Sequence, residues 1–114
     1  MKPYPIAITQ AVQRNAETVQ TINPQLPLQA DIVEWHLISL LNTGSALTQC
    51  KQGFMQGGNF YPVYGVASLS QHVSMQGTFP VVTPGDYLPA FTVTGGTLAD
   101  LYYFTALGTA YVYD

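Results

Sequence analysis

From residue 28 onward, hydrophobic residues fall in short runs rich in β-branched and aromatic residues, which is typical of β-strands. In residues 31–41 hydrophobic residues can be assigned to the two faces of such a strand, at a period of two residues. One face of this predicted strand carries Ile32, Glu34, His36, Ile38 and Leu40, and the other carries Val33, Trp35, Leu37, Ser39 and Leu41. Because the second set contains no charged residue, we expect it to face the core.

Several further segments are predicted to be strands, because β-branched and aromatic residues fill them and Gly, Pro or Asn residues separate them. These segments are residues 46–51, 54–56, 60–66, 69–75, 78–83, 87–94 and 101–113. Short strands at this spacing, without a convincing helix among them, are typical of antiparallel sandwiches and barrels. We therefore expect an all-β antiparallel β-sandwich, with a single jelly roll as its topology.

The first 28 residues differ from the rest, since they contain four of the 8 prolines and several glutamines. We interpret residues 1–28 as an N-terminal arm and residues 29–114 as a β-sandwich domain. Apolar residues from Ile8 to Val19 recur at helical spacing, which favours a short helix followed by an extended segment. The alternative is a terminus without fixed structure in the free protein.

Charge is scarce in this chain, because charged residues make up 8% of it whereas soluble domains average about 25%. A surface with few charges and many tyrosines suits a subunit that neighbouring subunits cover. The 3 cationic residues are too few for the several phosphate contacts that nucleic-acid binding needs, so we expect no direct nucleic-acid partner. The most hydrophobic segment, residues 32–41, is too short for a bilayer-spanning helix, so we expect no transmembrane segment.

Candidate catalytic chemistry is sparse. Glu34 and His36 lie two residues apart on one face of a predicted strand, where they could share a metal ion or act as an acid–base pair. A metal site would need further ligands, and His72 and Asp31 are the candidates. The alternative, which we favour, is that this strand face looks outward or into a subunit contact.

Cys50 is the one cysteine of the chain, which excludes an intramolecular disulfide and a multi-cysteine zinc site. Paired with His36 or His72 it would form a thiol nucleophile, but a lone cysteine in a strand is more often a buried hydrophobic residue. The chain also lacks a Gly-x-Ser-x-Gly turn and a phosphate-binding glycine loop. We expect no enzyme, no cofactor, and no catalytic or metal-ligating residue.

The aromatic residues are more numerous than one small core can hide with every hydroxyl group hydrogen-bonded. Tyrosines at an interface provide contact area at a low cost in side-chain entropy. We expect the following residues at a subunit interface: Tyr61, Tyr64, Tyr102, Tyr103, Tyr111 and Tyr113. The alternative is stacking against sugar rings, which is less favoured because the single tryptophan, Trp35, lies in the most hydrophobic strand.

A local sequence in the last third of the chain carries a resemblance to known proteins. The run Gln76-Gly77-Thr78-Phe79-Pro80-Val81-Val82-Thr83-Pro84-Gly85 is followed by the predicted strand 87–93, a glycine turn and a last strand rich in aromatic residues. This arrangement resembles the carboxyl half of small single jelly-roll proteins of bacteriophage virions, above all the penton proteins at the five-fold vertices of tailless, membrane-containing phages. The likeness covers about a third of the chain and implies a structural role in the virion, without any catalytic residue.

We therefore expect a phage capsid protein, a penton (vertex) or minor capsid subunit located in the capsid shell. It would form a homo-oligomer, with a pentamer as the expected state, and residues 1–28 would tie it to neighbouring capsid proteins. A capsid decoration or cement protein with three-fold symmetry is one alternative. A glycan- or receptor-binding β-sandwich module is another, and a small enzyme would need Glu34, His36 and His72 to converge in one pocket.

Overall fold

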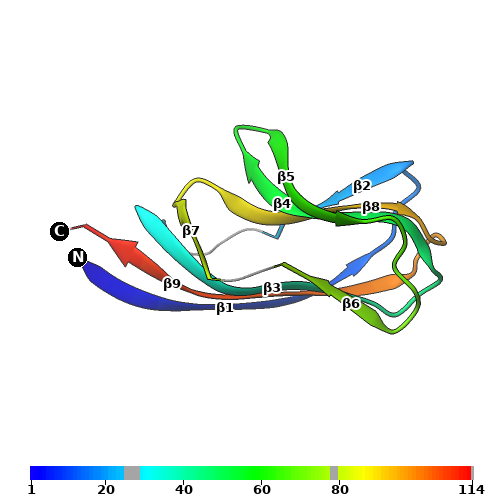
Figure 1. The fold of residues 1–114 in the computed structure, drawn as a ribbon, viewed down its shortest axis with the longest axis horizontal. Helices are drawn as coiled ribbons and strands as arrows, with labels where there is room; N and C mark the ends of the chain where they lie inside the picture. The colour runs from blue at the N-terminus through cyan, green and yellow to red at the C-terminus, as the bar shows by residue number, and fades with distance from the viewer. Residues whose placement is uncertain (25–28, 78–79, 114) are drawn as a thin grey trace.

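The computed structural model describes residues 1–24, 29–77 and 80–113, which form two β-sheets packed face to face (Figure 1). The strands are β1 (Lys2–Gln13), β2 (Val19–Ile22), β3 (Ile32–Asn42), β4 (Leu47–Gln56), β5 (Asn59–Val66), β6 (Val73–Gln76), β7 (Val81–Pro84), β8 (Leu88–Gly95) and β9 (Leu101–Val112). The described residues contain no helix, and so none that is long and apolar enough to cross a membrane. The expected all-β antiparallel sandwich is confirmed.

The strands pair in a nested order. Sheet A contains β1, β9, β3 and β6 in that order, with β7 also paired to β3, and sheet B contains β2, β8, β4 and β5. β1 therefore pairs with β9, β2 with β8, β3 with β6 and β7, and β4 with β5, all antiparallel. This nesting of early strands with late ones is the topology of a jelly roll, as the sequence predicted. Both termini lie at the same end of the molecule (Figure 1).

The segment expected to form an N-terminal arm contributes a strand to each sheet. β1 pairs with β9 at each of its 12 positions. The predicted short helix is wrong, because Ile6, Ile8 and Val12 also fit a two-residue period, and in β1 they pack toward the core. Pro3 and Pro5 are compatible with this edge strand, because a missing N–H group on its free side breaks no ladder hydrogen bond. The described part of residues 1–28 is therefore built into the sandwich.

β3 lies inside sheet A and contains a β-bulge at His36. The register against β9 shifts between Trp35 and Leu37, so one extra residue exchanges the two faces of the strand. The predicted core face is therefore right for Val33 and Trp35 and wrong beyond the bulge. The buried residues that follow are Ile38, Leu40 and Asn42, and the residues that turn outward are Leu37, Ser39 and Leu41.

β4 also differs from expectation, since the predicted strands 46–51 and 54–56 form one strand that runs through Gly53. A neighbouring strand approaches closely at this point. A Cβ atom on Gly53 would collide with the carbonyl oxygen of Tyr61 on β5. The glycine therefore permits close strand pairing here and does not end the strand.

The remaining predicted strands match the structure to different degrees. Segments 60–66, 87–94 and 101–113 correspond closely to β5, β8 and β9. Segment 69–75 is reduced to β6, and Leu69 makes only an isolated bridge to Leu47. Residues 78–79 of the predicted strand 78–83 lie outside the described residues, and its later part corresponds to β7.

The core between the sheets is built around Trp35. This residue is fully buried, and its indole Nε1 donates a hydrogen bond of 3.0 Å to the Thr83 hydroxyl oxygen on β7. Gly108 on β9 lies beside the indole. A Cβ atom on Gly108 would lie 2.5 Å from the carbonyl oxygen of Glu34 and 3.2 Å from Cε3 of Trp35. The missing side chain at this position therefore makes room for the indole.

We predict that Gly108→Ala destabilises the protein by about 1–3 kcal/mol, because the added methyl group overpacks the core against Trp35 and the β3 backbone. Chemical denaturation followed by Trp35 fluorescence measures the change. Gly65→Ala is the matched control, because the nearest atom to its added Cβ would be Cγ of the flexible Lys51 side chain, at 3.2 Å. Equal stability of G108A and the wild type would contradict the packing described here.

Candidate functional site

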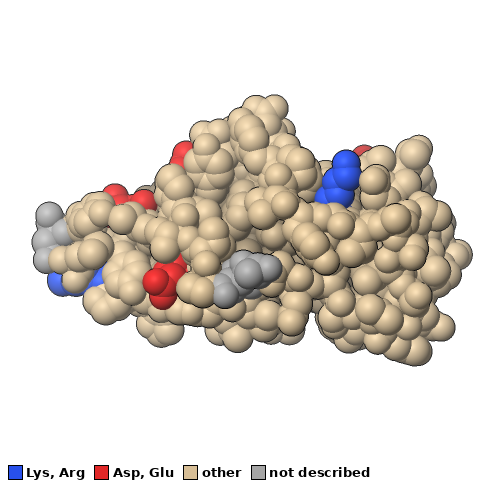
Figure 2. Space-filling view, in the orientation of Figure 1, with Lys and Arg blue, Asp and Glu red and all other residues tan. Residues whose placement is uncertain are grey.

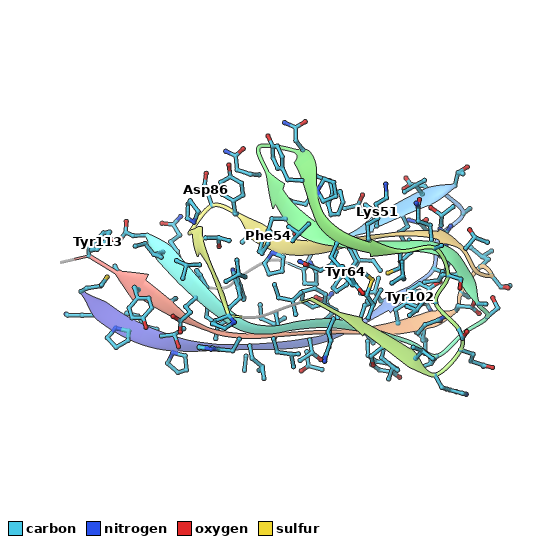
Figure 3. All side chains as sticks on the ribbon, in the orientation of Figure 1. Lys51, Phe54, Tyr64, Asp86, Tyr102 and Tyr113 are labelled. Atoms are coloured by element: carbon cyan, nitrogen blue, oxygen red, sulfur yellow. The ribbon has the colours of Figure 1, made fainter. Side chains whose placement is uncertain are left out.

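The tyrosines predicted at a subunit interface fall on separate parts of the surface and, in one case, in the core. Tyr61 and Tyr64 lie on β5 and are 46% and 48% exposed. Tyr103 and Tyr111 lie on the outer face of sheet A, where Tyr103 is 39% exposed and Tyr111 is half-buried. Tyr113 follows β9 at the end of the molecule that carries both termini, and it is exposed (Figure 3).

Tyr102 is not a surface residue, and its assignment to an interface is wrong. It alternates with Tyr103 along β9 and therefore points between the sheets, where it is fully buried (Figure 3). Its hydroxyl group has no hydrogen-bond partner among the residues that the structure describes. Burial raises the pKa of Tyr102, and the positive charge of Arg14 partly offsets this effect.

Tyr61, Val63 and Tyr64 form the first exposed apolar area, which we call the β5 surface. β5 is an edge strand of sheet B, and the register shift against β4 leaves Val63 unpaired and 67% exposed. The Tyr61 ring rests against the Tyr87 ring at a centroid distance of 6.0 Å. A shallow depression of about 200 Å³ is lined by Lys51, Pro62, Val63, Tyr64 and Gly65. β5 therefore presents exposed apolar side chains at an edge of sheet B.

The second area lies on the outer face of sheet A, where small residues on β1 adjoin large residues on β9. Ala7 pairs with Leu107, Thr9 with Thr105, and Ala11 with Tyr103. We call Ala7, Thr9 and Ala11 the β1 shelf, and Leu101, Tyr103 and Leu107 the β9 wall. The three shelf residues are exposed, and the wall residues are 38%, 39% and 39% exposed in that order. Neither set contains a charged residue.

Charge is as scarce on the surface as in the composition. Figure 2 shows that uncharged residues cover nearly all of one face of the molecule. Arg14, one of the 3 cationic residues of the chain, is buried and adds nothing to the surface charge. The molecule therefore lacks the dense coat of mixed charge that keeps free monomers apart.

Arg14 is a buried residue that holds several segments together through hydrogen bonds, and the sequence did not predict this role. It is 6% exposed, and its guanidinium group donates hydrogen bonds to the carbonyl oxygens of Gly95 at 2.8 Å, Thr18 at 3.1 Å and Asn15 at 3.0 Å. The side-chain oxygens of Asn15 and Gln20 accept two more, at 3.2 and 3.4 Å. These uncharged acceptors tie the end of β1 to β2 and β8. A single arginine in a sequence gives no signal of such burial.

Asp100 connects two turns near the same end of the sandwich. Its Oδ2 accepts hydrogen bonds from the Ser45 amide at 3.0 Å, the Ser45 hydroxyl group at 2.9 Å and the Thr97 amide at 2.9 Å. The hydrogen bond from the Thr97 amide, followed by that from the Ser45 hydroxyl group, lowers the pKa of Asp100. Asp100 therefore holds the β3–β4 turn against the turn before β9.

Glu34 and His36 lie together on the outer face of sheet A, and His72, in the turn before β6, does not join them. His36 Nε2 lies 3.4 Å from Glu34 Oε1 and 3.3 Å from Thr109 Oγ1. The described residues contain no group of three or more His, Cys, Asp or Glu side chains that could hold a metal ion. The side chains of His36 and Glu34 are 48% and 37% exposed, so this is a solvated surface pair.

Cys50 and Trp35 both face the core. Cys50 is fully buried, and burial raises its pKa to about 12. A thiol with this pKa is protonated at neutral pH and is a poor nucleophile. Trp35 is fully buried as well and is not available to stack on a sugar ring.

Comparison with known proteins places the fold. No protein family and no curated protein matches the sequence. A solved structure of a Bacillus endospore appendage, described as one of a novel family of disulfide-linked pili, is similar with a TM-score of 0.58 and 12% sequence identity. The similarity covers 97% of this chain and 89% of that chain. At this identity the likeness shows that the two chains share a β-sandwich fold.

We predict that Cys50 does not react with a thiol reagent such as Ellman's reagent while the protein is folded at pH 8, because the thiol is buried and protonated. Addition of denaturant should release one reactive thiol per chain. Absorbance of the released thiolate measures both states. Rapid reaction of the folded protein would contradict the position of Cys50 in the core.

We predict that Asp100→Asn lowers stability at neutral pH, because a neutral amide accepts these hydrogen bonds less strongly than a carboxylate. A carboxyl group whose pKa is lowered on folding stabilises the protein above its ordinary value of 3.8, and this stabilisation is lost as the pH falls through the folded value. The difference between wild type and D100N should therefore be largest at neutral pH and disappear in acid. Thermal unfolding across this pH range measures it, and a difference independent of pH would contradict the assignment.

Proposed function

We propose that this chain is a self-assembling structural subunit of a protein shell, and specifically a penton or minor capsid subunit of a bacteriophage virion. The observation that carries the proposal is the nearly uncharged surface with two exposed apolar areas, the β5 surface and the outer face of sheet A. Aromatic and apolar residues without charge are typical of surfaces that a partner covers. The described site residues offer no comparable support for catalysis.

The separation of the two areas supports assembly beyond a dimer. The β5 surface belongs to sheet B and the β1 shelf belongs to sheet A, so the areas lie on different layers of the sandwich. A subunit with two separate contact areas holds two neighbours at once, as a closed ring or a fibre requires.

The virion form of the proposal is supported by the jelly-roll topology, which viral capsid domains frequently use. It is also supported by the resemblance of residues 76–85 to penton proteins, a run that contains β7. Residues 2–13 form β1 and are paired along their whole length in this structure. We therefore assign contacts with neighbouring capsid proteins to the exposed faces of the sandwich.

A fibre subunit is the second candidate, and the fold shared with the endospore appendage protein favours it. That protein is described as part of disulfide-linked pili, whereas the single cysteine of this chain is buried. A fibre of this subunit would therefore be held by noncovalent contacts.

We predict that the purified chain forms a closed oligomer, with five copies as the expected number. Light scattering after size exclusion, repeated over about a hundredfold range of concentration, measures the mass, since subunit assembly is concentration-dependent. Electron microscopy of the same samples distinguishes rings from fibres.

The outcomes separate the candidates. A pentameric ring would support the vertex subunit, and a trimer would favour a capsid decoration protein. Open fibres would support the second candidate. A monomer at every concentration would overturn self-assembly as the function and leave glycan or receptor binding to be tested.

A further inference from the structure

We propose that the β5 surface of one copy binds the β1 shelf of the next copy, against its β9 wall, so that copies join head to tail. The occupant of the shelf is thus a second copy of this chain. This inference rests on the proposed self-assembly and names the two surfaces that perform it.

The two surfaces lie at opposite corners of the sandwich. β1 is the edge strand of sheet A that is farthest from β6, and β5 is the edge strand of sheet B next to β4. Because β6 lies against β4, β5 and β1 are on opposite lateral edges as well as on different layers. A contact between such surfaces leaves one free surface at each end of a pair of copies. It therefore extends to a ring or a fibre and cannot close as a two-fold dimer.

The two surfaces differ in the size of their side chains. The shelf consists of an Ala, Thr, Ala column on β1, and the larger Leu107 and Tyr103 of the wall stand directly beside it in the paired strand. This produces a step with an apolar side. The β5 surface instead carries three large residues, Tyr61, Val63 and Tyr64, which are 46%, 67% and 48% exposed. Large residues seated over small ones bury apolar area without a steric clash.

The charges near the two surfaces also favour a second copy. Neither surface contains a charged residue, so their contact buries no unpaired charge. Lys51 lines the depression beside the β5 surface. Glu34 lies on the outer face of sheet A opposite Thr109, which in turn pairs with Pro5 at the end of the shelf. Opposite charges thus flank the two surfaces, and such flanking charges promote encounter and orientation.

The expected strength of one contact is low. An 8-residue strand is about 27 Å long, and two adjacent strands are about 10 Å wide, so the flat area covered is roughly 300 Å² per copy. Interfaces at this end of the size range are weak and transient when single. Assembly should therefore depend on protein concentration and gain stability when a ring closes, since every copy then makes two contacts.

We predict that Thr9→Glu on the shelf and Val63→Lys on the β5 surface each convert the assembled protein to a monomer. In each case an unpaired charge enters an apolar contact. An equal mixture of the two variants should recover assembly. The new carboxylate then meets the new ammonium group at one contact, and the unchanged surfaces meet at the next. Because the two variants must alternate, a ring of five cannot contain matched contacts only, so the mixture should form dimers and longer open assemblies in place of the closed ring.

Light scattering of each variant and of the mixture at one total concentration measures these outcomes. Gln49→Lys is the matched control, because Gln49 is an exposed residue of β4 outside both surfaces and should leave the mass unchanged. Circular dichroism and thermal unfolding of each variant at low concentration establish that the monomers are folded.

The results separate this contact from the function on which it rests. If the wild type assembles and either single variant still does so, the contact is overturned and self-assembly stands. If both single variants are monomeric and their mixture remains so, the two surfaces do not bind each other and the contact is again overturned. If the wild type itself is a monomer throughout, the proposed function fails together with the contact.

Discussion

β9 lies between β1 and β3, with a backbone ladder on each of its edges, and the rest of the structure depends on this placement. Its inward residues Tyr102, Phe104 and Ala106 supply the core, and Gly108 leaves the space that Trp35 fills. Its outward residues form the wall beside the β1 shelf. One strand therefore fixes the core and the proposed contact together, because alternation sends successive side chains to opposite sides of the sheet.

The strand content and the jelly-roll class could be predicted from sequence, because alternation and turn residues are local signals. The strand conformation of residues 2–13, which form β1, could not be predicted in this way. Its prolines and glutamines resemble a linker, and its apolar residues fit a helical period as well as a strand period. What decides the outcome is pairing with β9, about a hundred residues away, and such long-range pairing has no local signal. The bulge at His36 is of the same kind, since it depends on the register against β9.

The candidate surfaces were predicted in part. The number of tyrosines indicated that some must reach the surface, and Tyr61, Tyr64 and Tyr103 do so. Tyr102 does not, and the alternation along β9 already separated it from Tyr103. The shelf of small residues on β1 could not be predicted. Its alanines and threonine form a step only because the larger Leu107 and Tyr103 lie beside them on the paired strand. The burial of Arg14 also required the three-dimensional arrangement, since one of its acceptors, Gly95, lies 81 residues away along the chain.

The distance along the chain between β1 and β9 has a consequence during protein synthesis. β1 is made early, and it has no partner in sheet A until residues 101–112 have left the ribosome. The step formed by the shelf and the wall therefore does not exist on an incomplete chain. A truncated or stalled product without β9 lacks the proposed place for another copy to bind. Joining of subunits in the proposed way would therefore be restricted to chains that have been translated through β9 and have completed the sheet.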